Sequence, residues 1–471
     1  MARVVILGAG VVGLTTAMLL SKDGHEVVVL ERDAAEPVGD HDALWSGWER
    51  RGVNQFRLLH YFQPGFRSRL HSELPAVAAA LDAAGALRHN VLALVPEQLS
   101  GGFREGDEQY EALTARRPVM EAVLAMTATS MPGVDVRRGA TVAGVVTGVA
   151  AEAKVPHVVG VRTANGEELR ADLVVDALGR RSPLGAWLEA EGARPAVEER
   201  EDCGFVYYGR YFRSTDGSVP AMIGPLLQDY GSVSILTLPA DNGTWGVGII
   251  VSARDKTARA LKDTATWQRT IAAFPLAAHW AEGQAMDDTV AAMAGIEDQH
   301  RDYCPDGSPV ATGVVSVGDS WACTNPSLGR GATIGLFHAI ALRDVMRSGR
   351  LDAPEVFVRD FSAKTAETVE PWYRSTLAYD RARLAEVDAE VTGNPYEPDQ
   401  IWDFTRAMTS AAGKDGEVLR ARLRIACLLQ SSDGVLATPG IFERVIEHGA
   451  GWREEPTFGP NRDEFLQLLA G

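Results

Sequence analysis

The chain of 471 residues is too long for one simple hydrophobic core, so we expect two or three domains. Its 46 Lys and Arg against 63 Asp and Glu give a net charge of −17, which disfavours nucleic acids and anionic membranes as partners because both require a basic surface. The four cysteines lie far apart without a CxxC pair, which favours a reducing cytoplasm over a disulfide framework, and no metal site is expected.

The N-terminal segment predicts a strand, a helix and a second strand around a glycine-rich turn. Residues 4–21 are uncharged, but their glycines and the polar SKDGHE segment that follows argue against a signal peptide or a membrane span. Gly8, Gly10 and Gly13 form a GxGxxG motif, and Glu31 closes the second strand eighteen residues after the last glycine. In such a motif the glycines admit a pyrophosphate to the helix N-terminus, and the carboxylate accepts hydrogen bonds from a ribose. The pattern predicts a dinucleotide site for NAD or FAD.

The segments that follow do not continue as an NAD-binding sheet would. Residues 40–110 are a long insertion that contains WERRGVNQFRLLHYFQPGFRSRL, and residues 115–126 then predict a helix with Pro118 in its first turn. Residues 158–184 predict a hairpin that turns at Asn165-Gly166 before the buried strand LVVDALG. A nucleotide-binding sheet with such insertions favours a ligand that extends beyond the part of a dinucleotide bound at the GxGxxG motif.

A second glycine-rich motif lies far along the chain, in VVSVGDSWACTNPSLGRGATIGLFHA. It predicts a short buried strand, then Gly318-Asp319, a Pro/Gly-rich turn and a helix that begins near Gly331. An aspartate at the mouth of a buried strand, facing a loop with two glycines, indicates a polar ligand that lies against the backbone.

Three blocks of the sequence resemble the FAD-dependent monooxygenase superfamily of p-hydroxybenzoate hydroxylase, squalene epoxidase and styrene monooxygenase. They are the GxGxxG segment to Glu31, the middle motif LVVDALGRRSPL and the late SVGDSWACTNPSLGRGATIGLFHA, whose order is closest to the styrene monooxygenase and squalene epoxidase branch. The resemblance implies an α/β fold with a Rossmann-like FAD-binding domain in residues 1–185 and 301–350. It also implies an inserted β-sheet substrate domain in residues 186–300 and a helical C-terminal region in residues 351–471.

The same resemblance implies the residues that bind the ligands. It places the ADP half of FAD at the first motif, the ribityl chain at Asp319, and the isoalloxazine ring at the late turn, where the helix dipole stabilises negative charge. His60 is a candidate catalytic residue. The aromatic strands of residues 186–300 are expected to wall the substrate pocket, with Tyr207, Tyr211, Met222 and Trp245 as candidates, although alternation lets only about half of them face one side. The expected FAD contacts are Gly8, Gly10, Val12, Gly13, Glu31, Arg32, Arg117, Val142, Gly318, Asp319, Pro326, Gly329, Gly331 and Ala332.

The activity implied is a monooxygenase that hydroxylates or epoxidises a largely apolar small molecule with O2, through a flavin C4a-hydroperoxide. A second GxGxxG motif for NAD(P)H is missing from the sequence, so electrons come either from NAD(P)H bound transiently or from a partner flavin reductase. Three alternatives remain. One is a reductase of the geranylgeranyl reductase type, and another is a flavin-dependent halogenase, although WxWxIP is absent. The third is a non-catalytic binding protein of the kind represented by GDP-dissociation inhibitors.

Overall fold

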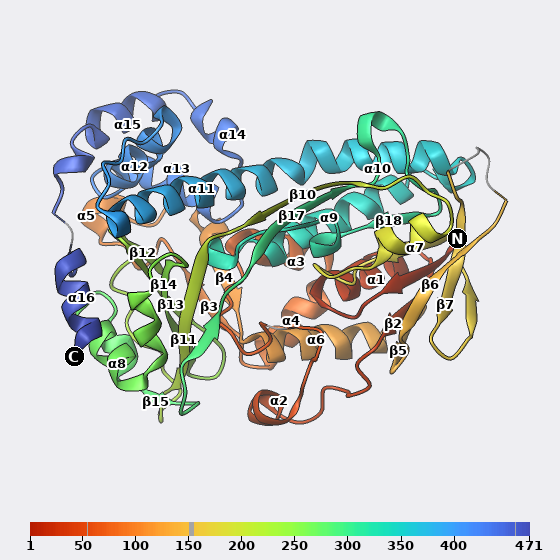
Figure 1. Cartoon of the computed structure of the whole chain (residues 1–471), viewed down its shortest axis with the longest axis horizontal. Coiled ribbons are helices and arrows are strands. Elements are labelled where there is room, and N and C mark those ends of the chain that lie inside the picture. The colour runs from red at the N-terminus through yellow and green to blue at the C-terminus, as the bar shows by residue number, and fades with distance from the viewer. Residues whose placement is uncertain (54, 150–154, 457) are drawn as a thin grey trace.

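The first glycine-rich turn follows the central strand of a parallel sheet (Figure 1). The computed structural model describes residues 1–53, 55–149, 155–456 and 458–471, so Asn54 of the long insertion lies outside the described residues. Within the described residues the sheet has five strands in the order β18-β9-β1-β2-β5, and all four pairings are parallel. The strands are β1 (Arg3–Leu7), β2 (Glu26–Glu31), β5 (Val134–Arg138), β9 (Leu173–Asp176) and β18 (Val314–Ser316).

Different layers cover the two faces of this sheet because alternate residues of a strand point to opposite sides. Val4 and Ile6 pack in one core with helices, whereas Val5 and Leu7 pack in another with a small antiparallel sheet that turns, as predicted, at Gly166. These layers confirm the predicted α/β class. The helices are α1 (Val11–Lys22), α6 (Arg117–Ser130) and α9 (Gly331–Met346), and the small sheet has β6 (Val142–Thr147), β7 (Val158–Thr163) and β8 (Glu168–Arg170).

The insertion after β2 forms short helices and a hairpin. It carries the loop of residues 55–63 past the carboxyl end of the parallel sheet and then leads into α6. Its elements are α2 (His41–Gly47), α3 (Pro64–Glu73), α4 (Pro75–Ala83), β3 (Leu87–Asn90), α5 (Glu97–Ser100), η1 (Asp107–Tyr110) and β4 (Glu111–Thr114).

A second sheet, antiparallel, occupies the other end of the molecule (Figure 1). One face packs on α8 (Thr264–Ala272) and on the last helix, α16 (Arg462–Ala470), so the chain end returns to the sheet. The opposite face carries Leu236 and Leu238 and turns toward a cavity. The strands found in the described residues are β11 (Phe205–Arg213), β12 (Leu227–Tyr230), β13 (Val233–Pro239), β14 (Thr244–Ser252), β15 (Gln284–Ala285) and β16 (Ala291–Met293).

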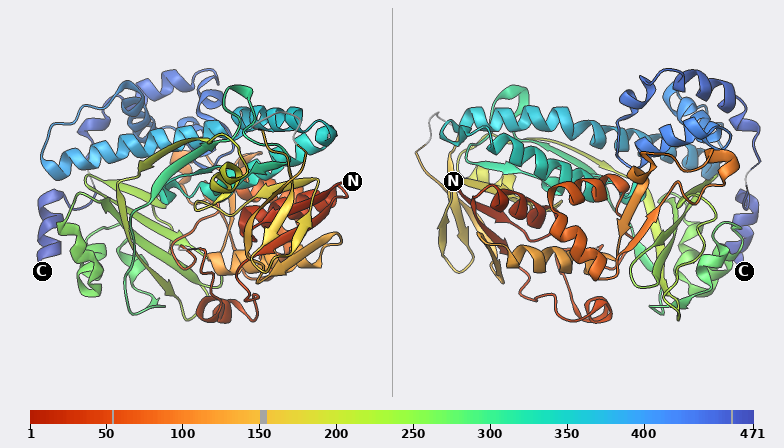
Figure 2. Two further views of the ribbon diagram at one scale, coloured as in Figure 1. Left: turned by 45° about the vertical axis from the view of Figure 1, so that its right-hand side comes forward. Right: turned by 180° about the vertical axis from the view of Figure 1, so that it is seen from behind.

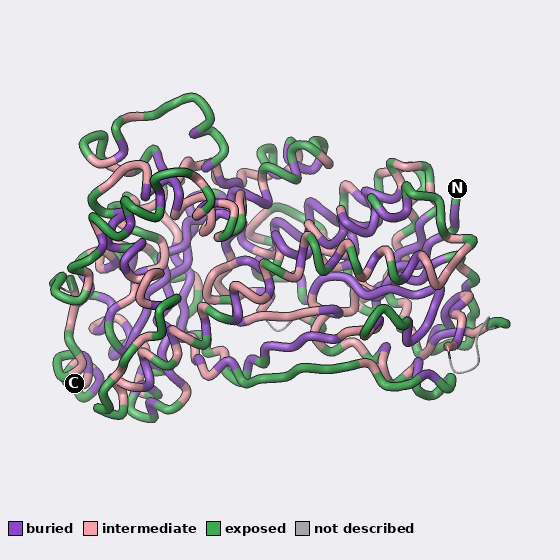
Figure 3. The backbone as a smooth tube through the Cα atoms, turned by 90° about the horizontal axis from the view of Figure 1, so that it is seen from above, coloured by how far each residue is buried: buried purple, intermediate pink, exposed green. Residues whose placement is uncertain are grey.

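Long elements join the two ends of the molecule. Strands β10 and β17 run between the sheets, and α11 crosses above them toward a group of C-terminal helices (Figure 1). These helices cover the segment around α5, with which they share a core (Figure 2). Buried backbone runs through both ends of the molecule, and exposed residues follow the outer loops and helix faces (Figure 3). The elements are α7 (Leu184–Ala190), β10 (Val197–Asp202), β17 (Glu297–Asp302), β19 (Ala322–Cys323), α10 (Pro354–Thr368), α11 (Glu370–Thr392), α12 (Gln400–Ala412), α13 (Gly416–Ala426), α14 (Ser432–Leu436) and α15 (Ile441–Gly449).

Candidate active site

One cavity joins the two glycine-rich motifs. It has a volume of about 2000 Å³ and lies between the carboxyl end of the parallel sheet, the inner face of the antiparallel sheet and the C-terminal helices. Gly13 is the one predicted cofactor residue that does not line it. The predicted cofactor residues that do are Gly8, Gly10, Val12, Glu31, Arg32, Arg117, Val142, Gly318, Asp319, Pro326, Gly329, Gly331 and Ala332.

The glycines of the two motifs fall into two groups. Gly8 has a φ of +101° and a Cβ there would lie 2.6 Å from the Ala177 carbonyl, while a Cβ at Gly13 would lie 2.0 Å from the Gly8 carbonyl. The protein itself requires these two glycines. A Cβ at Gly10 or at Gly331 would meet no atom of the described residues within 4 Å. Both positions line the cavity at the N-terminus of a long helix, and their open space fits a ligand that approaches the backbone there.

Glu31 lies in a buried cluster of charges at the end of β2. Its Oε2 accepts hydrogen bonds from the Ala9 N–H at 2.9 Å and from Arg50 Nη2 at 2.6 Å, and its Oε1 accepts from the Asp33 N–H at 3.0 Å. Arg50 also donates to Glu121 at 2.6 Å. Since a carboxylate offers about four lone-pair positions, one remains on Oε1 for a ribose hydroxyl. Sequence reasoning missed Arg50, because nothing in the polar segment distinguishes it from its neighbours.

The two adjacent arginines at the start of α6 have different surroundings. Arg116 is fully buried and forms a bidentate ion pair with Asp241, at 2.7 Å through Nη2. Arg117 lines the cavity, and its Nε donates to Glu121 at 2.6 Å. Arg116 therefore joins the start of α6 to the turn between β13 and β14, whereas Arg117 faces the cavity.

Asp176 of the middle motif ties this motif to the late one. Its carboxylate is completely buried and accepts from the Leu178 N–H at 3.0 Å and from Ser182 Oγ at 2.6 Å. It also accepts from Ser316 and Ser320, both at 3.2 Å. These four donors indicate a structural role, because they hold β9 and β18 in register just before Asp319.

Asp319 lies in η5 (Gly318–Ser320) and is exposed to the cavity. Its side chain makes no hydrogen bond to the part of the chain that the structure describes. Burial raises its pKa, and the charges of Arg117 and Arg180 act against that rise. A strand-end carboxylate without a protein donor fits a ligand with hydroxyl groups.

His60 lies on the cavity wall between the backbone and Arg117. Its Nδ1 lies 2.9 Å from the Leu58 carbonyl, which can only accept, so Nδ1 carries the proton and Nε2 accepts from Arg117 Nη1 at 3.0 Å. Burial, and then the charge of Arg117, lower the pKa of His60 to about 3. The imidazole is therefore neutral near pH 7 and orients Arg117.

The late turn, residues 325–331, is fixed by a network around Asn325. The backbone N–H of this residue donates to Asp298 at 2.6 Å, and its side-chain amide donates to Asp380 at 3.1 Å. The amide oxygen accepts from the Tyr207 hydroxyl, and Asp380 also accepts from Ser327 Oγ at 2.8 Å. Three distant segments therefore hold one turn.

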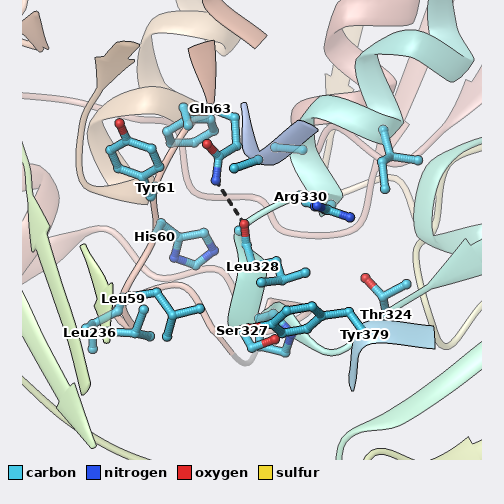
Figure 4. A pocket seen from close by; sticks show the side chains of 18 of the residues that line it. Leu59, His60, Tyr61, Gln63, Leu236, Thr324, Ser327, Leu328, Arg330 and Tyr379 are labelled. Atoms are coloured by element: carbon cyan, nitrogen blue, oxygen red, sulfur yellow. Dashed lines mark hydrogen bonds between the residues drawn. The ribbon is translucent and has the colours of Figure 1, made fainter. Parts of the chain in front are cut away.

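The other side of the late turn faces the loop before α3 (Figure 4). Gln63 Nε2 donates to the Leu328 carbonyl at 2.9 Å. Leu59 and Leu236 lie together across the pocket from the turn (Figure 4). Tyr379 of α11 lies next to Ser327 of the turn (Figure 4). The turn thus presents backbone to a space with an apolar opposite wall.

Burial raises the pKa of Asp380 to about 7, so the folded protein retains a proton on this carboxyl at pH values where the unfolded chain has lost it. The free energy of unfolding therefore falls as pH rises from about 4 to about 7. Asp380→Asn cannot titrate, so its stability relative to wild type should rise by up to about 1.4 kcal/mol per pH unit in this window. Urea unfolding across the window measures this. Asp352→Asn, on the surface, is the control, and a pH-independent difference for Asp380→Asn would contradict the buried proton.

Of the four predicted substrate residues, Tyr207 and Met222 line the cavity. Trp245 does not, because it lies opposite Phe212 on the face of the sheet that the helices cover. Its indole N–H donates to the Trp280 carbonyl at 2.6 Å.

Tyr211 is also absent from the cavity wall. It shares the inner face of β11 with Tyr207 but lies beyond the cavity, where its hydroxyl donates to the Leu58 carbonyl at 3.1 Å. Its ring packs edge-on against Trp45 at 4.8 Å. Tyr211 therefore anchors the loop that carries His60.

Comparison with known proteins explains why the two motifs share a cavity. Residues 3–75 match the family of FAD dependent oxidoreductases. The structure is similar to that of PqsL, a probable FAD-dependent monooxygenase from Pseudomonas aeruginosa, with a TM-score of 0.61 and 17% identity over 82% of this chain and 99% of PqsL. The chain is an FAD-dependent oxidoreductase with the fold of the flavin monooxygenases. Its cofactor is FAD.

Two further relatives extend the comparison of this oxidoreductase. Protein Rv3254 of Mycobacterium tuberculosis is 25% identical over an alignment of 396 positions that covers 79% of each chain. The structure of OxyS anhydrotetracycline hydroxylase from Streptomyces rimosus has a TM-score of 0.55 and 18% identity, and covers 91% of this chain and 76% of OxyS. In the part of the oxidoreductase that the structure describes, no helix is long and apolar enough to cross a membrane.

Proposed function

We propose that this oxidoreductase is a monooxygenase that inserts one atom of O2 into a largely apolar small molecule. The single cavity that joins Gly10 to the late turn carries the proposal, because FAD bound across it would present its ring to an apolar wall. PqsL has been crystallised with 2-aminobenzoylacetate, and OxyS is a hydroxylase, which supports a small organic substrate here as well.

The residues of the cavity fit FAD. Gly10 and Gly331 leave space against backbone at the two helix N-termini, Glu31 keeps an acceptor for a ribose, and Asp319 faces the cavity without a protein donor. Arg117 and Arg180 supply positive charge near Asp319. When bound and reduced, FAD supplies the chemistry that activates O2.

The protein would position the flavin and the substrate, stabilise developing charge and exclude water from the site. The N-terminus of α9 directs its positive end toward the late turn, where it stabilises negative charge. Opposite the turn, the wall is apolar and holds Leu59, Leu236, Leu238 and Met293. Such a wall excludes water, which protects a reactive oxygen species from side reactions.

Two routes can bring the electrons. A depression of about 430 Å³ beside the middle motif is lined by four arginines and one acidic residue, and the arginines would bind the phosphates of NAD(P)H. These residues are Arg180, Arg181, Arg200, Arg301 and Glu297. A partner flavin reductase is the other route. Rapid reduction of the bound flavin by NADPH alone would favour the first route, and reduction only in the presence of a reductase would favour the second.

Replacing Asp319 should weaken FAD binding. A hydrogen bond to a charged group contributes about 1.5–3 kcal/mol, so Asp319→Ala is expected to raise the dissociation constant of FAD about tenfold to a hundredfold. Asp319→Asn keeps an acceptor oxygen and should have a smaller effect. Flavin fluorescence titration measures both, with Asp352→Ala as the surface control. An unchanged FAD affinity in Asp319→Ala would show that this carboxylate does not bind FAD.

The reaction itself is tested with the FAD-loaded, reduced protein and a panel of aromatic and polyene compounds. A monooxygenase oxidises its flavin faster when its substrate is present and yields a product with one added oxygen atom. A reductase of the geranylgeranyl reductase type instead yields a hydrogenated product, and its flavin oxidation needs no O2. Stimulation by charged, polar compounds alone would contradict an apolar substrate.

A further inference from the structure

The cavity extends well beyond the residues of the two glycine-rich motifs. Ligand pockets commonly reach about 1000 Å³, and this cavity has a volume of about 2000 Å³. Beyond the late turn it continues between the insertion hairpin and the helices α12, α13 and α15. These helices come from the C-terminal region and hold none of the predicted cofactor residues.

The far part of the cavity, which we name the C-terminal chamber, has an apolar and aromatic wall. Leu94, Val95 and Leu99 of the insertion face it from the other side. Charged side chains also reach this end of the cavity, so the wall is mainly rather than wholly apolar. Arg406 pairs with Asp229 at 3.5 Å, and other charged residues there are Arg422, Asp433 and Glu455. The residues that define the chamber are Trp402, Phe404, Met408, Leu419, Leu423 and Phe442.

The chamber opens directly beside the late turn. Tyr379 of α11 stands at the junction, near Ser327 (Figure 4). Its ring packs edge-on against Trp402 at 5.2 Å, and its hydroxyl donates to Asp229 at 3.2 Å. The next residue, Asp380, bonds to the turn itself. One ligand can therefore contact both the turn and the chamber.

The outer rim of the same cavity carries large apolar side chains that are exposed to solvent. Ile401 is 77% exposed, and four other large hydrophobic residues that line the cavity are between 44% and 72% exposed. Exposed apolar side chains that line one cavity are more typical of a binding site than exposed apolar side chains scattered singly over a surface. The four are Leu94, Ile223, Phe442 and Phe458.

We infer that the C-terminal chamber binds the distal part of an elongated, apolar substrate whose reacting end lies at the late turn. The substrate class is then a molecule with a long alkyl chain or an extended fused-ring system, and a single-ring compound would leave the chamber unfilled. This inference rests on the proposed function, because it takes the late turn as the place of the reaction. It assigns α12, α13 and α15 to substrate selection.

A homologous series of 4-alkylphenols, from ethyl to dodecyl, tests the inference with the oxidised, FAD-loaded protein. Calorimetry measures binding without turnover. Each methylene that enters the chamber should lower the dissociation constant about fourfold. Thr405 of α12 lines the same cavity as Leu423 of α13. Leu423→Trp and Thr405→Trp, two independent ways to fill the chamber, should stop this gain at a shorter chain and leave the affinity for the ethyl compound within about twofold. Thr392→Trp, on an exposed face of α11, is the matched control and should behave as wild type.

The possible results test the role of the chamber separately from the proposed monooxygenase reaction. A gain with chain length that the two chamber variants shorten supports the chamber. A flat series in wild type, or the same dependence in wild type and in both folded variants, overturns it and leaves the proposed oxygenation intact. A chain-length dependence in a protein that only hydrogenates its substrates would keep the chamber and overturn the monooxygenase.

Discussion

Gly10→Val is expected to give a folded protein that no longer retains FAD. A Cβ at Gly10 meets no described atom within 4 Å, and its φ of −84° with ψ of −176° suits a valine. The free protein should therefore keep its stability within about 0.5 kcal/mol. A bound pyrophosphate needs that space, so the affinity for FAD should fall at least about a hundredfold, or about 2.7 kcal/mol. Absorbance of the purified protein and thermal unfolding after removal of FAD measure the two effects.

Two other glycines make this result specific. Gly144→Val, on β6 and away from the cavity, also places its Cβ in open space and should leave both FAD binding and stability unchanged. Gly13→Ala places its Cβ 2.0 Å from the Gly8 carbonyl, so it should destabilise the protein even without FAD. If Gly10→Val purifies with a full complement of FAD, the cofactor does not lie at the N-terminus of α1.

Asn325→Ala is expected to lower both stability and FAD affinity. The substitution leaves the hydroxyl of Tyr207 without its amide acceptor and Asp380 without one of its donors. Both groups lie in the interior, since Asn325 is only 1% exposed. Each buried polar group left without a partner costs about 1–3 kcal/mol, so the loss should reach about 2–5 kcal/mol. The late turn then loses its anchor, and FAD should bind about tenfold or more weakly.

Asn325→Asp separates this anchor from a simple packing effect. It preserves the shape of the side chain but adds a third carboxylate beside Asp298 and Asp380, whose pKa values burial raises to about 6 and about 7. Its FAD affinity should therefore fall further above about pH 7 than at about pH 5, because like charges then repel. Asn394→Ala, at an exposed position, is the control. An unchanged melting temperature and an unchanged FAD affinity in Asn325→Ala would show that the conformation of the turn does not depend on the hydrogen bonds of Asn325.

The parts of the site that sequence could predict are those with local causes. GxGxxG between a strand and a helix predicts its own geometry, since the turn, the helix N-terminus and Glu31 are set by neighbours in the chain. The late motif shows the same local logic, with Asp319 at a strand end and Gly331 at the start of a helix. The shared cavity and the α/β layers follow from these motifs.

The parts that sequence missed depend on contacts between distant residues. Arg50 reaches Glu121 across 71 positions of the chain, and Asn325 reaches Asp380 across 55. Neither pair has a spacing that a motif could reveal. Trp245 was expected in the substrate wall and lies on the opposite face, because the register of β11 and β14 decides the face and a single strand does not show it.

Oxygen-18 labelling tests the proposed reaction most directly. The FAD-loaded, reduced protein is mixed with oxygen-18 gas and with each compound of the aromatic and polyene panel, including its long-chain members. Mass spectrometry then measures the masses of the products. Monooxygenation predicts a product that carries one oxygen-18 atom from the gas, made only when FAD is bound and absent with Gly10→Val. A product that gains two hydrogens and no label, or a label that enters from water alone, would contradict it.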